Sequence, residues 1–141
     1  MVGDFEYRLA AWHQFRTLVE RDESPFTKVI NYWNAVPLSS RNVDPYDQST
    51  WPDPWEMIEE NSFCEFTKLL AVAYTLQLTK RFANSDLVFK IGVDNRLSRL
   101  YYMLLVDDQI IGLDDDKSMY VMEQEPENMH LQKIHTLKKS Y

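Results

Sequence analysis

The sequence NSFCEFTKLLAVAYTLQLTK, residues 61–80, contains the strongest helix signal in the chain. Its apolar residues recur at the spacing of three and four that brings side chains onto one helix face: Phe63, Phe66, Leu69, Leu70, Ala73 and Leu76. A helix with this pattern buries at least one face against the rest of the protein. The stretch therefore predicts a central buried helix on which the other elements pack.

The one cysteine of the chain, Cys64, lies in the first turn of this predicted helix. Ser62 and Glu65 match a capping box, which would place Cys64 at the second helical position. The exposed N–H groups and the helix dipole at that position favour a thiolate. Cys64 is then either a nucleophile or a small apolar side chain that fills the core, and both interpretations stay open. A single cysteine also allows no disulfide within the chain, which is typical of a reducing compartment.

Composition and charge limit the class of protein. The 141 residues, 45% of them hydrophobic, suffice for one domain with a real core. The formal net charge of −7 disfavours binding to nucleic acid or to an anionic membrane, because both require a basic patch, but it permits a basic protein partner. The chain has no run of about 20 apolar residues, and its N-terminus does not resemble a signal peptide. We expect a cytoplasmic protein, or part of a particle assembled there, that binds other proteins without a cofactor.

Residues 1–60 predict helices joined by turns and one long loop. Apolar residues at helical spacing indicate a helix over 4–21. Ser24 followed by Pro25 predicts the cap and first residue of a second, short helix. Asp53 before Pro54 predicts the same arrangement for a third helix that ends at residue 60.

The long loop between these helices, PLSSRNVDPYDQSTWPDP at residues 37–54, contains four prolines and two large aromatic residues. Prolines with Ser, Asn and Asp are typical of irregular structure, whereas flexible linkers usually lack aromatic residues. We expect an ordered loop in which aromatic side chains pack on the core. Tyr46, Trp51 and the adjacent Trp55 are also our candidate binding residues, since Trp and Tyr dominate the hot spots of protein interfaces.

Beyond residue 82 the pattern changes to short strands. Residues 87–93, 100–106 and 109–113 predict three strands joined by turns, and residues 119–123 predict a fourth at the sheet edge. Helices followed by antiparallel strands indicate an α+β fold. We expect one domain over 1–124, made of a helical part (1–60) and a part with the core helix and strands (61–124). Residues 125–141 would be a C-terminal tail, loose or docked on a partner.

The order of cysteine, buried helix and antiparallel strands resembles the transglutaminase-like core of the papain-like cysteine enzymes. FCEFTKLLAVAYTL is similar to the family's catalytic-cysteine motif, and the strand, turn and strand that close at Asp114 resemble the segment carrying its histidine and aspartate. The resemblance covers about residues 60–116. It implies Cys64 as nucleophile and Asp114 as the residue that orients the base.

The family's histidine is not found at the corresponding place, where this chain has Arg99. A guanidinium group can favour a thiolate but cannot act as a general base at neutral pH. The resemblance therefore implies a degenerate site in a noncatalytic structural or adaptor protein. The alternative is an active acyl transferase or peptidase that uses Cys64 with a base from elsewhere in the chain. A small regulatory protein that binds a host factor is a third interpretation.

The stretch DPYDQSTWPDPWE, residues 44–56, resembles a segment of uncharacterised tailed-phage proteins of transglutaminase-like type. This resemblance implies virion components of the neck, tail or baseplate as partners, in an oligomeric assembly. The location would be the virion or the host cytoplasm.

No metal site is expected. Asp114, Asp115 and Asp116 could supply oxygen ligands, but their spacing does not fit an EF-hand loop, and a solvated turn after a strand accounts for them. His130 and His135 have no nearby Cys or His that would complete a zinc site.

Overall fold

A computed structural model describes residues 1–39 and 43–138 of the chain. Over these residues, four α-helices and one short 3-10 helix precede five strands. In chain order they are α1 (Phe5–Val19), α2 (Pro25–Asn34), η1 (Gln48–Thr50), α3 (Pro54–Glu60), α4 (Glu65–Gln77), β1 (Leu87–Asp94), β2 (Arg99–Val106), β3 (Gln109–Leu113), β4 (Met119–Met122) and β5 (Met129–Thr136). The fold is α+β, as the sequence predicts.

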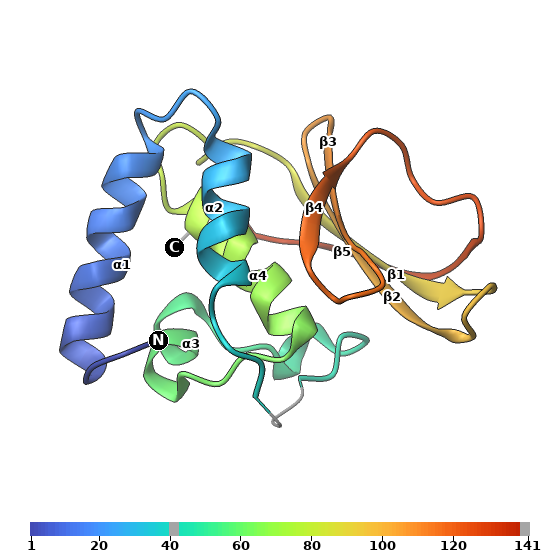
Figure 1. Cartoon of the computed structure of the whole chain (residues 1–141), viewed down its shortest axis with the longest axis horizontal. Coiled ribbons are helices and arrows are strands. Elements are labelled where there is room, and N and C mark those ends of the chain that lie inside the picture. Colours follow the sequence, from blue (N-terminus) through green and yellow to red (C-terminus); the bar gives the residue numbers. More distant parts are fainter. Residues whose placement is uncertain (40–42, 139–141) are drawn as a thin grey trace.

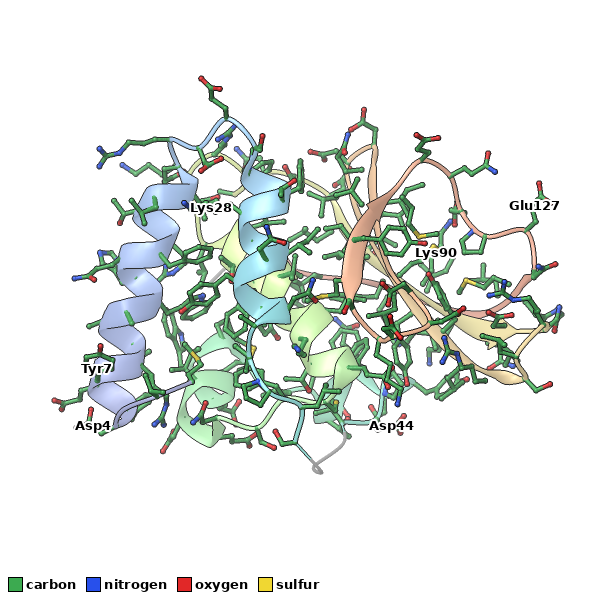
Figure 2. The ribbon with its side chains drawn as sticks, viewed as in Figure 1. Asp4, Tyr7, Lys28, Asp44, Lys90 and Glu127 are labelled. Atoms are coloured by element: carbon green, nitrogen blue, oxygen red, sulfur yellow. The ribbon has the colours of Figure 1, made fainter. Side chains whose placement is uncertain are left out.

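The strands form one antiparallel sheet in the order β4-β3-β2-β1-β5. The helices gather on one side of the molecule and the sheet lies on the other, with α4 between them (Figure 1). Side chains fill the space between these layers (Figure 2). This arrangement places the start of α4 beside β2, where the candidate cysteine site lies.

Helix α4 is the central element, and every residue from Phe66 to Gln77 is buried. The indole N–H groups of Trp12 on α1 and Trp33 on α2 both donate to the hydroxyl of Thr75, over 3.0 and 2.9 Å. Two buried donors are thereby satisfied by one acceptor on α4, which fixes how both N-terminal helices pack. The predicted central buried helix is confirmed.

The predicted start of this helix is wrong by two positions. Cys64, with φ −83° and ψ 178°, is the N-cap residue and not the second helical residue, and Ser62 is not the cap. The reason is a long-range pairing: the N–H of Phe63 donates to the Ser39 hydroxyl over 2.6 Å, and the Ser39 N–H donates to the Phe63 carbonyl over 2.9 Å. These bonds keep Phe63 extended, so the helix starts after it.

The sequence signals for the starts of α2 and α3 agree with the structure. Helix α3 spans the predicted residues 54–60, and a capping box joins Asp53 and Glu56 as the sequence indicates. Ser24 and Pro25 begin α2, although the Ser24 side chain makes no capping hydrogen bond. The predicted edge strand is confirmed as β4.

The segment predicted as a tail instead contains strand β5, which pairs with β1 from Val88 opposite Thr136 to Asp94 opposite Met129. The connection from β4 to β5 passes from one edge of the sheet to the other, and an ion pair of 2.8 Å between Lys90 and Glu125 ties it to β1. The sequence of β5 is mostly polar and exposed, so it lacks the alternation of a half-buried strand. The α+β domain therefore continues to residue 138, rather than ending at 124.

Candidate functional site

Cys64 lies on the wall of a pocket of about 480 Å³ formed by the loop after α2, the first turn of α4 and strand β2. The cysteine is 7% exposed. The residues around it are Leu38, Ser39, Val43, Pro45, Glu65, Phe66, Leu100, Tyr102 and Lys117. A 3.0 Å ion pair between Lys117 and Glu65 joins two of the lining side chains.

The hydrogen bond of the Cys64 thiol is with Thr67, over a distance of 3.1 Å between Sγ and Oγ1. Across the pocket stands Tyr102, whose pKa is raised to about 12 by burial and then by the nearby Glu65, Cys64 and Tyr46. Tyr102 therefore keeps its proton at neutral pH and does not act as a general base there. Thr67 and Tyr102 are the polar neighbours of the thiol that the sequence interpretation missed.

The strand register explains why Tyr102, and not Arg99, faces the cysteine. Side chains alternate between the two faces of a strand, and Leu100 and Tyr102 both line the pocket. Arg99 is therefore on the opposite face of β2, where its guanidinium pairs with Asp115 over 3.5 Å. Strand alternation leads from Leu100 to Tyr102, but the structure is needed to show that Leu100 lines the pocket.

Asp114 lies directly after β3, and its carboxylate organises the turn that follows. The Oδ1 atom accepts the backbone N–H groups of Asp116 and Ser118 over 2.9 and 3.0 Å. The partners of this carboxylate are thus backbone groups of its own turn, and a histidine is not among them. Asp114 serves as a turn residue in this arrangement.

The three histidines lie on α1 and β5. His13 and His130 are exposed, whereas His135 is buried with its ring 4.9 Å from that of Trp51. The His135 ring donates to the carbonyl of Pro45, its Nε2 has no partner within the described residues, and desolvation lowers its pKa. In the part of the chain that the structure describes, no hydrogen bond joins a histidine to Cys64. The cysteine, base and orienting carboxylate are therefore not brought together.

The aromatic residues of the long loop divide into anchors and one exposed residue. Trp51 is 9% exposed and packs against Phe66, Phe89 and His135, so it holds the loop on the core. The hydroxyl of half-buried Tyr46 donates to the side chain of Gln132 on β5. Both side chains thus have partners inside the protein.

Trp55 differs, because 43% of it is exposed on α3 while its ring makes an edge contact with Trp12 at 6.1 Å between centroids. The surrounding sequence, residues 43–65, carries carboxylates and no Lys, Arg or His: Asp44, Asp47, Asp53, Glu56, Glu59, Glu60 and Glu65. We call the exposed part of α3 with Trp55 and its flanking acidic residues the α3 surface. On α3 itself the exposed side chains besides Trp55 are Glu56, Glu59 and Glu60, and the Arg8 guanidinium of α1 donates to backbone carbonyls of the same helix. An aromatic side chain beside carboxylates is suited to a positively charged protein segment.

The structure thus shows an α+β protein with two candidate sites. One is a pocket beside Cys64, in which the described residues place no histidine on the thiol, and the other is the α3 surface with Trp55. No protein-family model, curated protein or solved structure matches the chain. The transglutaminase-like and tailed-phage resemblances consequently stay predictions.

Within residues 1–39 and 43–138, no helix is both long and apolar enough to cross a membrane. Over the same residues, His, Cys, Asp and Glu side chains do not gather in groups of three or more that could hold a metal ion.

Proposed function

We propose that the protein is a noncatalytic adaptor or structural protein, and that its α3 surface binds a basic segment of another protein. The observation that carries this proposal is the exposure of Trp55 on a helix whose neighbouring side chains are acidic. Tryptophan is enriched among the few residues that dominate binding energy at protein interfaces.

Trp55 is well placed for this role because its ring is already held. The edge contact with Trp12 and the capping box between Asp53 and Glu56 fix the ring and the helix that carries it. A side chain that is ordered before binding loses less conformational entropy when a partner docks. The exposed part of the ring can therefore contribute most of its contact energy to binding.

The charge around Trp55 determines the kind of partner. The acidic residues of 43–65 attract a Lys- or Arg-rich segment and repel an acidic one. A cation can also stack on the face of the tryptophan ring. The resemblance of residues 44–56 to tailed-phage proteins extends the proposal to virion components as partners.

The contacts of Cys64 support a noncatalytic role. Its thiol is hydrogen-bonded to Thr67, Tyr102 keeps its proton at neutral pH, and the carboxylate of Asp114 accepts hydrogen bonds from its own turn. A thiol nucleophile needs a base to take its proton, and the carboxylate that lines the pocket beside Cys64, that of Glu65, is paired with Lys117.

A binding titration tests the proposal. The full chain is titrated with a labelled Arg- and Lys-rich peptide and with a Glu-rich peptide of equal length, at low and at physiological salt. We expect saturable binding of the basic peptide alone, about tenfold or more weaker in Trp55→Ala. The matched control is Tyr7→Ala, since Tyr7 is a 60% exposed aromatic residue on α1 (Figure 2). Equal binding by wild type and Trp55→Ala, or equal loss in both variants, contradicts the proposal.

A second candidate function is an active cysteine acyl transferase or peptidase. The specific observation in its favour is that Cys64, at the N-cap of α4, borders a pocket of about 480 Å³. Rapid alkylation of Cys64 by iodoacetamide at neutral pH, compared with a free thiol of a small peptide, would support this function. Slow alkylation that speeds up only on unfolding would contradict it.

A further inference from the structure

A pocket of about 240 Å³ between the second half of α1 and the end of α4 shares no lining residue with the cysteine pocket. Its lining carries cationic and hydroxyl side chains with a single carboxylate: His13, Arg16, Thr17, Glu20, Leu78, Thr79 and Lys80. This balance is unusual in a protein with a formal net charge of −7.

Arg16 is the central side chain of this pocket. Its guanidinium carbon lies 4.6 Å from the centre of the Trp12 ring, and its Nε is buried without a hydrogen-bond partner in the described residues. Two other arginines, Arg8 and Arg81, have hydrogen-bond partners for their guanidinium groups. Arg8 donates to three backbone carbonyls, and Arg81 donates to those of Val19 and Asp22. Arg16 as a whole is half-buried, so its charge is partly solvated, and its guanidinium is the cationic group of this pocket with unused hydrogen-bonding capacity.

The one carboxylate of the pocket does not supply that group. The two oxygens of Glu20 accept the backbone N–H groups of Lys80 and Arg81, each over 3.0 Å. Glu20 is thereby directed at the chain after α4. The exposed Lys80 and His13 lie at the rim and add positive charge at the mouth of the pocket.

We propose that this pocket binds a compact oxyanion, a carboxylate or a phosphate, with Arg16 as its main ligand and Lys80 as a second. A guanidinium group presents parallel N–H donors that match two oxygens of such an anion. The contact with the Trp12 ring holds the Arg16 guanidinium in position. The volume suits one anionic group rather than a nucleotide or other drug-sized ligand. The group comes either from a free anion or from an acidic side chain of a partner protein. No residue of α3 lines this pocket, so the anion-binding proposal does not depend on the proposed function of the α3 surface.

The test is a titration of the full chain followed by NMR of the arginine Nε–H signals and of the backbone N–H signals of Thr79 and Lys80, which remain in every variant, with sodium phosphate, sodium acetate and a short Glu-containing peptide at equal ionic strength and fixed pH. We expect the Arg16 signal to shift and saturate. Arg16→Met retains the aliphatic stem over Trp12 but removes the donors, and it should abolish saturable binding. The matched control is Arg21→Met, because Arg21 is an exposed arginine that does not line the pocket. Tightest binding by phosphate identifies a free anion as the ligand, and tightest binding by the peptide identifies a partner side chain.

If Arg16→Met fails to fold, a second pocket variant at an exposed position still tests the proposal. Lys80→Met changes an exposed side chain and should weaken binding at least about threefold, with an unchanged circular dichroism spectrum. Shifts that rise linearly without saturation, or that are equal in wild type and both pocket variants, overturn the proposal. In that case the Trp12 ring would be the main partner of the Arg16 guanidinium.

Discussion

The thiol of Cys64 and the hydroxyl of Thr67 lie 3.1 Å apart, one turn from each other at the start of α4. Either group can be the donor, so the thiol is satisfied within its own helix. This contact, together with the N-cap position, accounts for a cysteine at this place without invoking catalysis.

Replacement of Cys64 by serine should leave the fold and the binding intact. Serine is a favoured N-cap residue and can hydrogen-bond with Thr67, so we expect the free energy of unfolding to change by less than about 1 kcal/mol. Urea denaturation measures the stability, and the basic-peptide titration measures binding. A folded Cys64→Ser protein that no longer binds would show that the thiol itself is required.

Replacement of Thr75 by valine should be severely destabilising. The change removes the acceptor of two buried indole N–H groups, those of Trp12 and Trp33, at an expected cost of about 2–5 kcal/mol. Thr17→Val is the control, because the Thr17 hydroxyl is exposed and donates to the carbonyl of His13 in its own helix. Urea denaturation of both variants measures the difference, and a similar small loss in each would mean that the indoles find other acceptors.

The two tryptophans near the start of α3 should differ in their effect on stability. Trp51→Ala removes a buried anchor between the loop, α4 and β1, and we expect a loss of about 3–5 kcal/mol. Trp55→Ala removes a half-exposed ring and should cost about 1 kcal/mol, while it weakens peptide binding. Thermal unfolding separates these outcomes. A larger stability loss for Trp55 would assign this residue to the core instead of the α3 surface.

The buried His135 should make stability fall in acid. Desolvation lowers its pKa below the unfolded value of about 6.5, against smaller opposing effects of the Pro45 carbonyl and Asp47, while Lys133 lowers it further. The unfolded chain therefore binds the proton more readily, so the contribution is fully present above pH of about 6.5 and is lost as the pH falls from there towards the folded pKa. His135→Phe keeps a ring against Trp51 without the titration.

Urea denaturation at several pH values measures this effect. The loss of stability between pH about 7.5 and pH about 5 should be greater for wild type than for His135→Phe. The variant His130→Phe is the control, because His130 is exposed on the same strand. An identical pH dependence in wild type and His135→Phe would mean that other groups determine the acid sensitivity.

Local sequence signals determined much of the fold. The cap and proline at Asp53-Pro54 specify where α3 begins, because capping bonds join residues three apart in the chain. The apolar spacing within residues 61–80 identifies the buried helix, and short apolar runs identify β1 to β4. Each of these signals depends on neighbours in sequence.

Contacts between distant residues decided the rest. The pairing of Phe63 with Ser39 moves the start of α4 and puts Cys64 at the N-cap. The pairing of β5 with β1 turns a polar segment into a strand, since backbone hydrogen bonds there replace the apolar pattern that marks most strands. The sequence identified Cys64 as the residue to examine, but only the register of β2 against α4 decided that Tyr102 faces it while Arg99 points away, because adjacent side chains on a strand lie on opposite faces.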